Sequence, residues 1–339
     1  MENLAALAAK HAGDTVRLAL KHDPARKALV VFDAQSPLSR LLAEAYHQVL
    51  PEAPYIDYDA TTKEEVLAAI DLLGPQDLVV MIQSMTFRLD DFRIRIELFK
   101  RGLATVEHLH LERASLQDSD RQIAIYVDAL AYDPAYSLGR GHALKAHIDR
   151  AEKVTVRCAG TELTYEGGME PAKLNVGDYA GMKNVGGTFP IGEVFSEPRD
   201  LTRVNGEALL FAFADTDHLV RAYEPFKVSI KDGILTALPG APAEFHKVLA
   251  LIGAEEAIMV REFGLGLNPA MGPGKMLSDI TAFERQKGLH LSLGEKHGVY
   301  KKPGFNPKKT HFHIDVFVAV QSIEIDGEAI WRDGDFIVG

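Results

Sequence analysis

The stretch KALVVFD (27–33), followed by SPLSRLLAEAYHQVL (36–50), decides the fold class of the first half of the chain. A short apolar run between polar residues is typical of a buried strand, and the apolar positions that follow recur with helical spacing. Ser36 is suited to cap that helix, and Pro37 to occupy its first turn, where a missing N–H costs no hydrogen bond. A strand that leads directly into a helix begins a βαβ unit.

The same order repeats further along the chain. APYIDYD (53–59) precedes a helical pattern from Lys63 to Leu73, and the apolar strand DLVVMIQS (77–84) precedes the helical pattern DDFRIRIELFKRG (90–102), which ends at a glycine. The alternation predicts an α/β domain with a mostly parallel sheet over residues 1–150. No GxGxxG follows the first strand, so the sequence gives no support to a dinucleotide site.

The pattern changes after residue 150. EKVTVRCAGTELTYEG (152–167) alternates and turns like a β-hairpin, and Asp232-Gly233 is a hairpin turn signal within FKVSIKDGILTAL (226–238). A helical pattern, PAEFHKVLALIG (242–253), interrupts these strands. We therefore expect an α+β domain over residues 151–339, and the chemistry described below places a metal site in it.

Composition limits the classes of partner. The chain has 339 residues with a net charge of −11, which disfavours nucleic-acid or membrane partners because both need a basic surface. No apolar run approaches the length of a transmembrane helix, and the N-terminus lacks the features of a signal peptide. Cys158 is the single cysteine, which predicts a cytoplasmic protein and excludes a cysteine-based zinc site.

The segment THFHIDVFV (310–318) contains the clearest candidate ligands. Its β-branched and aromatic residues predict a strand, on which His311, His313 and Asp315 would share one face. An imidazole and a carboxylate on a rigid strand are well placed to bind one metal ion. The alternative interpretation is the exposed polar face of an edge strand.

A second segment, HLSLGEKHG (290–298), predicts a short strand that runs into a turn. His290 and His297 are too far apart to share a strand face. A turn at Gly294 would bring both to one centre, and two adjacent metals would also accommodate them.

Two carboxylates complete the candidate set. Glu262 follows an apolar strand in AIMVREFGLGLNP (257–269), where a carboxylate is costly unless it binds a metal or pairs with Arg261. Glu193 lies in GGTFPIGEVFSEP (186–198), which predicts a short loop with one inward carboxylate.

These segments supply up to six nitrogen and oxygen ligands, a set suited to zinc, cobalt, manganese or iron(II). Six exceed what one ion with an open position needs, which favours two metals roughly 3.5–4 Å apart. The candidates are Glu193, Glu262, His290, His297, His313 and Asp315.

Together with IDGEAIWRDGDF (325–336), these motifs occur in the order seen in the thermophilic aminopeptidase family (aminopeptidase T, aminopeptidase S and PepS). The resemblance covers about residues 150–339. It implies a metal-dependent aminopeptidase that cleaves N-terminal peptide bonds with a metal-activated water, using two ions, and that forms a homo-oligomer. Glu193 would be a ligand, the catalytic base or both; the other implied ligands are Glu262, His290, His313 and Asp315. Two positions depart from the family pattern, Gly192 for a glutamate and His297 for a tyrosine.

The segments GLGLNP (264–269) and KKTHFHID (308–315) also resemble 2,5-dihydroxypyridine dioxygenase, which implies an alternative function as a ring-cleaving enzyme with one iron(II) ion. That enzyme has a histidine where this chain has Glu262, so we favour the peptidase. Either reading predicts a small peptide or small-molecule substrate. A third hypothesis is a protein without enzymatic activity that keeps a metal for structure.

Overall fold

The computed structural model describes residues 2–89, 92–116, 118–179, 181–302 and 310–339. The chain divides into two compact units, and each contains more than one segment of the sequence. The first unit comprises Met1–Ser137, Gly177–Ile191 and Met276–Ala282; the second comprises Leu138–Val176, Gly192–Lys275 and Phe283–Gly339. The predicted boundary at residue 150 therefore differs from the observed one, because two later segments belong to the first unit.

The first unit has a parallel sheet of the predicted kind. Its described part contains a five-stranded sheet in the order β10-β6-β3-β1-β2, and every neighbouring pair is parallel. The strands are β1 (Ala28–Phe32), β2 (Tyr55–Asp57), β3 (Leu78–Ile82), β6 (Ala104–His108) and β10 (Gly186–Phe189), and a separate small hairpin is formed by β4 (Arg88–Leu89) and β5 (Phe92–Arg93).

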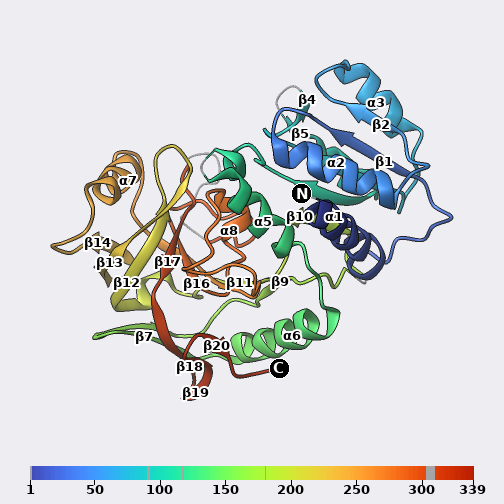
Figure 1. The fold of residues 1–339 in the computed structure, drawn as a ribbon. Coiled ribbons are helices and arrows are strands. Elements are labelled where there is room, and N and C mark those ends of the chain that lie inside the picture. Colours follow the sequence, from blue (N-terminus) through green and yellow to red (C-terminus); the bar gives the residue numbers. More distant parts are fainter. Residues whose placement is uncertain (1, 90–91, 117, 180, 303–309) are drawn as a thin grey trace. The chain divides into compact units, whose positions relative to one another are not determined.

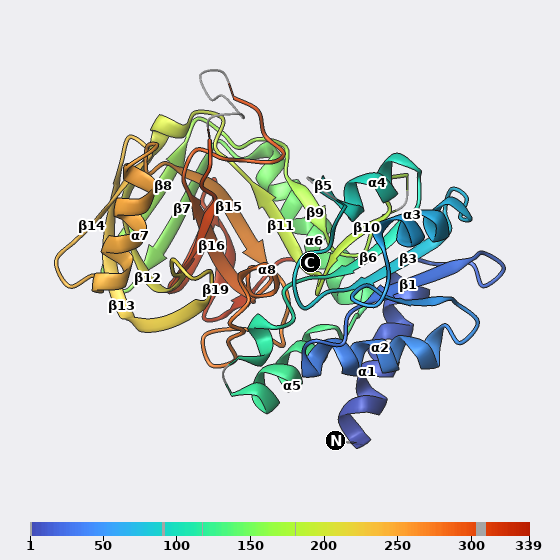
Figure 2. The same cartoon turned by 90° about the horizontal axis from the view of Figure 1, so that it is seen from above.

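Helices cover both faces of this sheet, with α3 and α4 on one face and α1 and α2 on the other (Figures 1 and 2). Ser36 caps α2 in a reciprocal arrangement with Ser39, and Pro37 is the first helical residue, as predicted. The helices of this unit are α1 (Glu2–Asp14), η1 (Thr15–Ala19), α2 (Pro37–Val49), α3 (Lys63–Asp71), α4 (Ile94–Lys100), η2 (Arg113–Ser115) and α5 (Ser119–Ala129). Residues 90 and 91 of the predicted helix 90–102 lie outside the described residues.

Strand β10 explains why the first unit is discontinuous. It comes from residue 186 onward, yet it pairs in parallel with β6, and Gly186 lies opposite Thr105. Gly186 has φ +90°, and a Cβ on it would lie 2.0 Å from the Thr105 carbonyl oxygen. Only glycine fits this close approach of two backbones, and no local pattern reveals a pairing across so many residues.

The second unit is built on a large, predominantly antiparallel sheet. Over the described ranges its main path is β20-β19-β18-β7-β8-β12-β17-β16-β15-β11-β9, and β13 pairs with both β12 and β14. The strands are β7 (Lys153–Cys158), β8 (Thr161–Glu166), β9 (Lys173–Asn175), β11 (Glu193–Ser196), β12 (Val204–Ala214), β13 (Val220–Lys231), β14 (Ile234–Ala237), β15 (Val260–Gly266), β16 (Gly288–Leu293), β17 (Ile314–Val318), β18 (Val320–Ile325), β19 (Glu328–Arg332) and β20 (Asp335–Phe336).

Two sequence-based predictions are confirmed in this sheet. β7 and β8 form the predicted hairpin, and β13 and β14 are joined by Asp232 and Gly233, both at positive φ as a tight hairpin turn requires. The predicted α+β class agrees with the few helices that accompany the strands: α6 (Pro134–Arg150), η3 (Leu201–Arg203) and α7 (Ala243–Gly253). The short helix α8 (Ile280–Phe283) belongs to the first unit except for Phe283.

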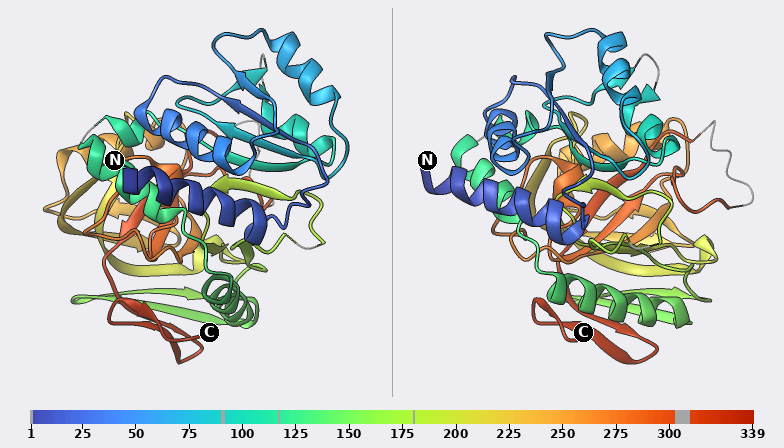
Figure 3. Two further views of the ribbon diagram at one scale, coloured as in Figure 1. Left: turned by 45° about the vertical axis from the view of Figure 1, so that its right-hand side comes forward. Right: turned by 90° about the vertical axis from the view of Figure 1, so that its right-hand side faces the viewer.

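Helices pack on the second unit at two places. The aromatic ring of Phe245 in α7 lies 5.0 Å from those of Phe213 and Phe226. From Leu138 onward α6 runs beside β18, β19 and β20 (Figure 3), where Arg150 pairs with Glu328 at 2.9 Å. The central strands β15 and β16 are buried along their whole length. No helix of the described residues is both long enough and apolar enough to cross a membrane.

Candidate metal centre

The candidate ligands gather on one face of four adjacent strands of the second unit. β11, β15, β16 and β17 are neighbours in the sheet, and Glu193 on β11 lies opposite Gly266 on β15. His290 lies opposite Gly264, and Asp315 lies opposite Ser292. Because alternate residues of a strand share a face, Glu262, Gly264 and Gly266 present two glycines and one carboxylate to this site.

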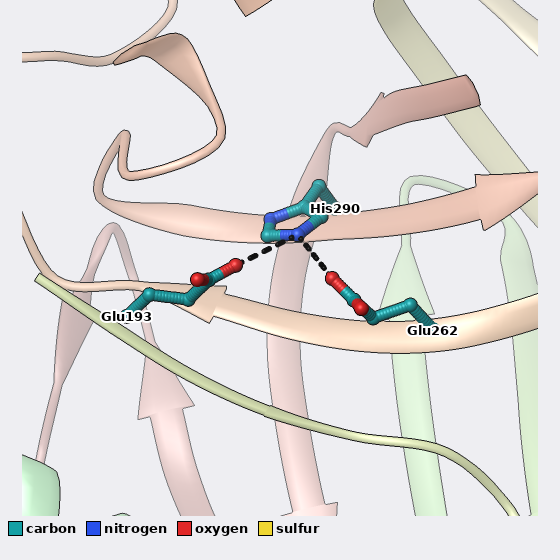
Figure 4. A group of neighbouring side chains, drawn as sticks. All are labelled: Glu193, Glu262 and His290. Atoms are coloured by element: carbon teal, nitrogen blue, oxygen red, sulfur yellow. Dashed lines mark hydrogen bonds and ion pairs between the residues drawn. The ribbon is translucent and has the colours of Figure 1, made fainter. Parts of the chain in front are cut away.

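Glu193, Glu262 and His290 form the first group of potential ligands. The His290 Nε2 lies 3.3 Å from Glu193 Oε1 and 3.2 Å from Glu262 Oε1, and Figure 4 shows both carboxylates pointing at the imidazole. All three side chains are buried. One ligand atom from each residue lies within 4.8 Å of the others.

A second group shares Glu262 with the first. It comprises Glu262, His313 and Asp315, again with ligand atoms within 4.8 Å of one another. The His313 Nε2 lies 3.3 Å from Asp315 Oδ1, and its Nδ1 lies 3.1 Å from the carbonyl oxygen of Lys296. Glu262 therefore stands between two clusters of nitrogen and oxygen donors.

His297 reaches the same carboxylate from the segment after β16. Gly294, at φ +110°, turns the chain, and His297 Nε2 comes to 2.9 Å from Glu262 Oε2, although without the alignment of a linear hydrogen bond. His290 and His297, on either side of the turn at Gly294, thus both approach the carboxylate of Glu262. His297 itself belongs to neither of the two groups of potential ligands found among the described residues.

The ion pair considered as an alternative for Glu262 is not formed. Arg261 precedes Glu262 on β15 and so points to the opposite face, where its Nε donates to Glu197 Oε2 at 2.8 Å. Glu262 is only 5% exposed. Its partners are the imidazoles of the site and not Arg261.

Two local predictions need correction. β17 begins at Ile314 rather than at Thr310, so His311 does not share the face of Asp315; it is exposed, with its Nε2 3.8 Å from Glu255. Glu193 opens strand β11 instead of lying in a loop. In both cases the residue at which the strand begins depends on pairing with distant strands, which the local pattern does not reveal.

Electrostatics at the site follow from burial and from the balance of charges. Burial raises the pKa of Glu262, but hydrogen bonds and charge from His290, His297 and His313 outweigh it and hold the pKa below its usual value. Burial lowers the pKa of His313, but Asp315, Glu262 and the Lys296 carbonyl raise it to about 10. Burial likewise lowers the pKa of His290, whereas Glu193 and Glu262 raise it well above normal.

Two further residues of this cluster were not predicted from the sequence. Arg285 is buried, and its Nη1 lies 3.2 Å from Glu193 Oε2 and in contact with Glu284. Burial raises the pKa of Glu284 to about 8, although the charge of Arg285 opposes the shift. An acid next to a base after Phe283 resembles an ordinary surface pair, so only the burial of Arg285 in the structure distinguishes it.

The donor set fits a divalent cation. Three carboxylates and two imidazoles meet within the two groups, and these are ligands that zinc, cobalt, manganese and iron(II) accept. Within the described part of the chain, His290 Nδ1 and Asp315 Oδ1 are buried and have no hydrogen-bond partner. Such clustered carboxylates are costly to bury unless positive charge accompanies them.

The first unit contains a cavity of about 880 Å³ with Arg26 and Lys27 at its rim. Lys27 Nζ donates to the Leu72 carbonyl at 2.9 Å, and Arg26 Nη1 donates to the Pro75 carbonyl at 3.0 Å. Leu72 is the C-cap of α3, where the helix dipole favours positive charge. Lys27 therefore neutralises a helix end, and Arg26 is hydrogen-bonded to a backbone carbonyl.

Comparison with known proteins shows similarity in fold but not in sequence. No protein-family model matches the sequence, and neither does any curated protein. Solved structures nevertheless share the fold along almost the entire chain.

Two of those structures match the two resemblances inferred from the sequence. One is 2,5-dihydroxypyridine dioxygenase from Pseudomonas putida KT2440, which is 17% identical with a TM-score of 0.68 and covers 99% of this chain and 98% of that chain. The other is wild-type AmpT from Thermus thermophilus, 14% identical with a TM-score of 0.60, covering 98% of this chain and 99% of that chain. At these identities the likeness establishes the fold alone. It extends the resemblance from residues 150–339 to the N-terminal half.

Proposed function

We propose that this protein is a metal-dependent aminopeptidase with a dinuclear site, which hydrolyses the N-terminal peptide bond of small peptides. The observation that carries the proposal is the position of Glu262 between two groups of ligands. A carboxylate has two oxygens, and in this chain one faces His290 while the other faces His297 on the side of the second group. This arrangement suits a carboxylate that bridges two ions.

The residues divide between two ions in a simple way. Glu193, His290 and Glu262 would hold one ion, and Glu262, His313 and Asp315 would hold the other. Divalent ions supply Lewis acidity that lowers the pKa of a water molecule and polarises a carbonyl group. Zinc, cobalt and manganese all accept this donor set.

The protein's own groups perform the remaining tasks. Glu193 binds Arg285 through Oε2, which fixes the orientation of its carboxylate and leaves Oε1 facing the ligands. In that orientation Oε1 can either ligate an ion or take a proton. Glu284, whose pKa is raised to about 8, holds a proton at neutral pH beside Arg285.

Metal content and hydrolysis test the proposal together. Protein purified without added metal should carry two zinc, cobalt or manganese ions per chain by elemental analysis. Chelation should abolish hydrolysis of amino-acid anilides, and added metal should restore it. A matched control is Glu207→Gln, which alters a solvent-exposed carboxylate that pairs with Lys227 and belongs to neither group of potential ligands. Absence of hydrolysis from every metal-loaded form would contradict the proposal.

The group of Glu262, His313 and Asp315 also supports a second candidate, because it can hold one ion without Glu193 and His290. A single iron(II) in this group would suit a ring-cleaving dioxygenase. One iron per chain, with oxygen uptake on 2,5-dihydroxypyridine, would establish this alternative. The close approach of Glu193 to His290 favours the dinuclear reading. A homo-oligomeric state stays a prediction.

A further inference from the structure

The two ring nitrogens of His297 have opposite surroundings. Its Nδ1 accepts hydrogen bonds from the backbone N–H groups of Val299, at 3.1 Å, and Tyr300, at 3.4 Å. In a neutral imidazole one nitrogen accepts while the other carries the proton. The proton of His297 is therefore on Nε2, the nitrogen that lies 2.9 Å from Glu262 Oε2.

His313 shows the reverse arrangement. Its Nδ1 lies 3.1 Å from the carbonyl oxygen of Lys296, which can only accept, so Nδ1 of a neutral His313 carries the proton and Nε2 has the lone pair. Histidines that bind metals usually donate their other N–H to a carbonyl or carboxylate in this way. The hydrogen bonding of His313 is thus that of a metal ligand. In His297 the nitrogen that faces the site, Nε2, carries the proton and has no lone pair to offer a metal ion.

The backbone around His297 is held by Arg261 from the opposite face of β15. The buried guanidinium donates from Nη1 to the carbonyl of Glu295 at 2.5 Å and from Nη2 to the carbonyl of Tyr300 at 3.2 Å. Its Nε donates to Glu197 Oε2 at 2.8 Å. Both ends of the segment that contains His297 are therefore fixed, and the N–H groups of this segment stay directed at Nδ1.

We propose that His297 is a positioning residue, not a metal ligand: its Nε2–H faces Glu262 and orients that shared carboxylate, while Arg261 holds the segment that sets the tautomer. The inference rests on the proposed function in that Glu262 is taken to bind metal. It assigns His297 a different role from the one the sequence predicted, and it gives the buried Arg261–Glu197 pair a purpose. Arg261 and Glu262 are consecutive residues of β15. This one strand therefore supplies the Glu262 carboxylate and also, through Arg261, the hydrogen bonds that hold the segment containing His297.

The tautomer can be read without any metal. Nitrogen-15 NMR of the imidazoles in metal-free protein, with His297→Gln to assign the signal, should show His297 protonated at Nε2 and unprotonated at Nδ1. A proton on Nδ1, alone or together with one on Nε2, would overturn the proposal. Since this measurement needs no ion, it decides the state of His297 even if the protein proves to bind no metal and the proposed function fails.

Metal titrations separate an orienting role from ligation. His297→Gln keeps an N–H donor and should retain both ions, whereas His297→Ala should retain both ions with affinity lowered about 10- to 100-fold, the usual cost of removing a residue that orients a ligand. Loss of one ion from both variants, with an unchanged thermal unfolding transition, would show that His297 is a ligand.

Arg261→Lys tests the support of the segment. Lysine keeps a positive charge for Glu197 but lacks the planar fork that reaches two carbonyls at once. The variant should lose the NMR signature of the His297 tautomer and weaken metal binding as His297→Ala does. An unchanged His297 signal with unchanged affinity would remove Arg261 from the proposal.

Discussion

His290 lies directly across from Gly264 in the antiparallel pair of β15 and β16, and its imidazole covers the space that a side chain at 264 would fill. An ideal Cβ on Gly264 would lie 2.1 Å from both Cε1 and Nε2 of His290. Real carbon atoms do not approach so closely. The missing side chain of Gly264 is therefore what allows the imidazole to lie against β15 and to reach Glu193 and Glu262.

Gly264→Ala should displace His290 and remove the ion that depends on it. The added methyl group cannot be accommodated without moving a buried ring, so we also expect the protein to lose about 1–3 kcal/mol of stability. Elemental analysis should find one ion per chain instead of two. Gly272→Ala is the matched control, because a Cβ there meets nothing within 4 Å; two ions in the Gly264→Ala protein would refute the packing argument.

The shared position of Glu262 predicts a pattern of metal loss among single variants. Glu193→Gln should remove the ion of the first group, and Asp315→Asn should remove that of the second, because each residue belongs to one group only. Glu262→Gln should remove both ions. Calorimetric titration with zinc would count the sites in each variant. If all three variants lose the same number of zinc sites, one ion and not two occupies this cluster.

Part of this site could be predicted from the sequence, because it depends on local rules. The turn at Gly294, which separates His290 from His297, was predicted from the glycine itself, and Gly294 has positive φ in the structure. The cap at Ser36 and the turn at Asp232-Gly233 were likewise visible in short stretches. In each case the deciding interaction joins residues only a few positions apart.

The rest depends on pairing between distant segments. The pairing that sets Asp315 opposite Ser292 starts β17 at Ile314, after His311, and the parallel pairing of β10 with β6 takes residues 177–191 into the first unit. The burial of Arg285 depends on the fold as a whole. A single sequence contains no signal for these contacts, so His311 was grouped with the wrong neighbours and Arg285 was overlooked.

The metal-free protein should lose stability as the pH rises from about 6.5 to about 10. The pKa of His313 is raised from 6.5 to about 10 in the folded chain, so between these values the folded state binds more protons than the unfolded state. Stability falls with rising pH wherever that is true. Glu284, with its pKa raised from 4.5 to about 8, acts in the same direction over the lower part of this range.

Urea unfolding in the presence of a chelator, at pH 7 and pH 9, would measure this effect. Zinc binding requires the neutral imidazole, so it releases protons and should tighten as the pH rises. Between pH 7 and pH 9 the metal-loaded protein should therefore lose less stability than the metal-free protein, or gain stability. A metal-free protein that is more stable at pH 9 than at pH 7 would contradict the assignment of a protonated His313.

Arg285→Met should destabilise the metal-free protein far more than the metal-loaded one. In the metal-free chain the Arg285 guanidinium supplies positive charge to the buried carboxylate of Glu193, and removing one partner of a buried ion pair typically costs about 3–5 kcal/mol. Bound zinc adds positive charge beside Glu193, so the loss should shrink when metal is present.

The measurement compares the free energy of unfolding of wild type and variant with a chelator and with saturating zinc. Arg221→Met is the control, because Arg221 pairs with Asp215 and Asp217 near the surface, where ion pairs contribute about 0–1 kcal/mol, and its small effect should not depend on zinc. An equal loss of stability for Arg285→Met in both conditions would mean that Arg285 supports the fold independently of the metal centre. A loss confined to the metal-free protein would instead show that Arg285 and a metal ion neutralise the same carboxylate.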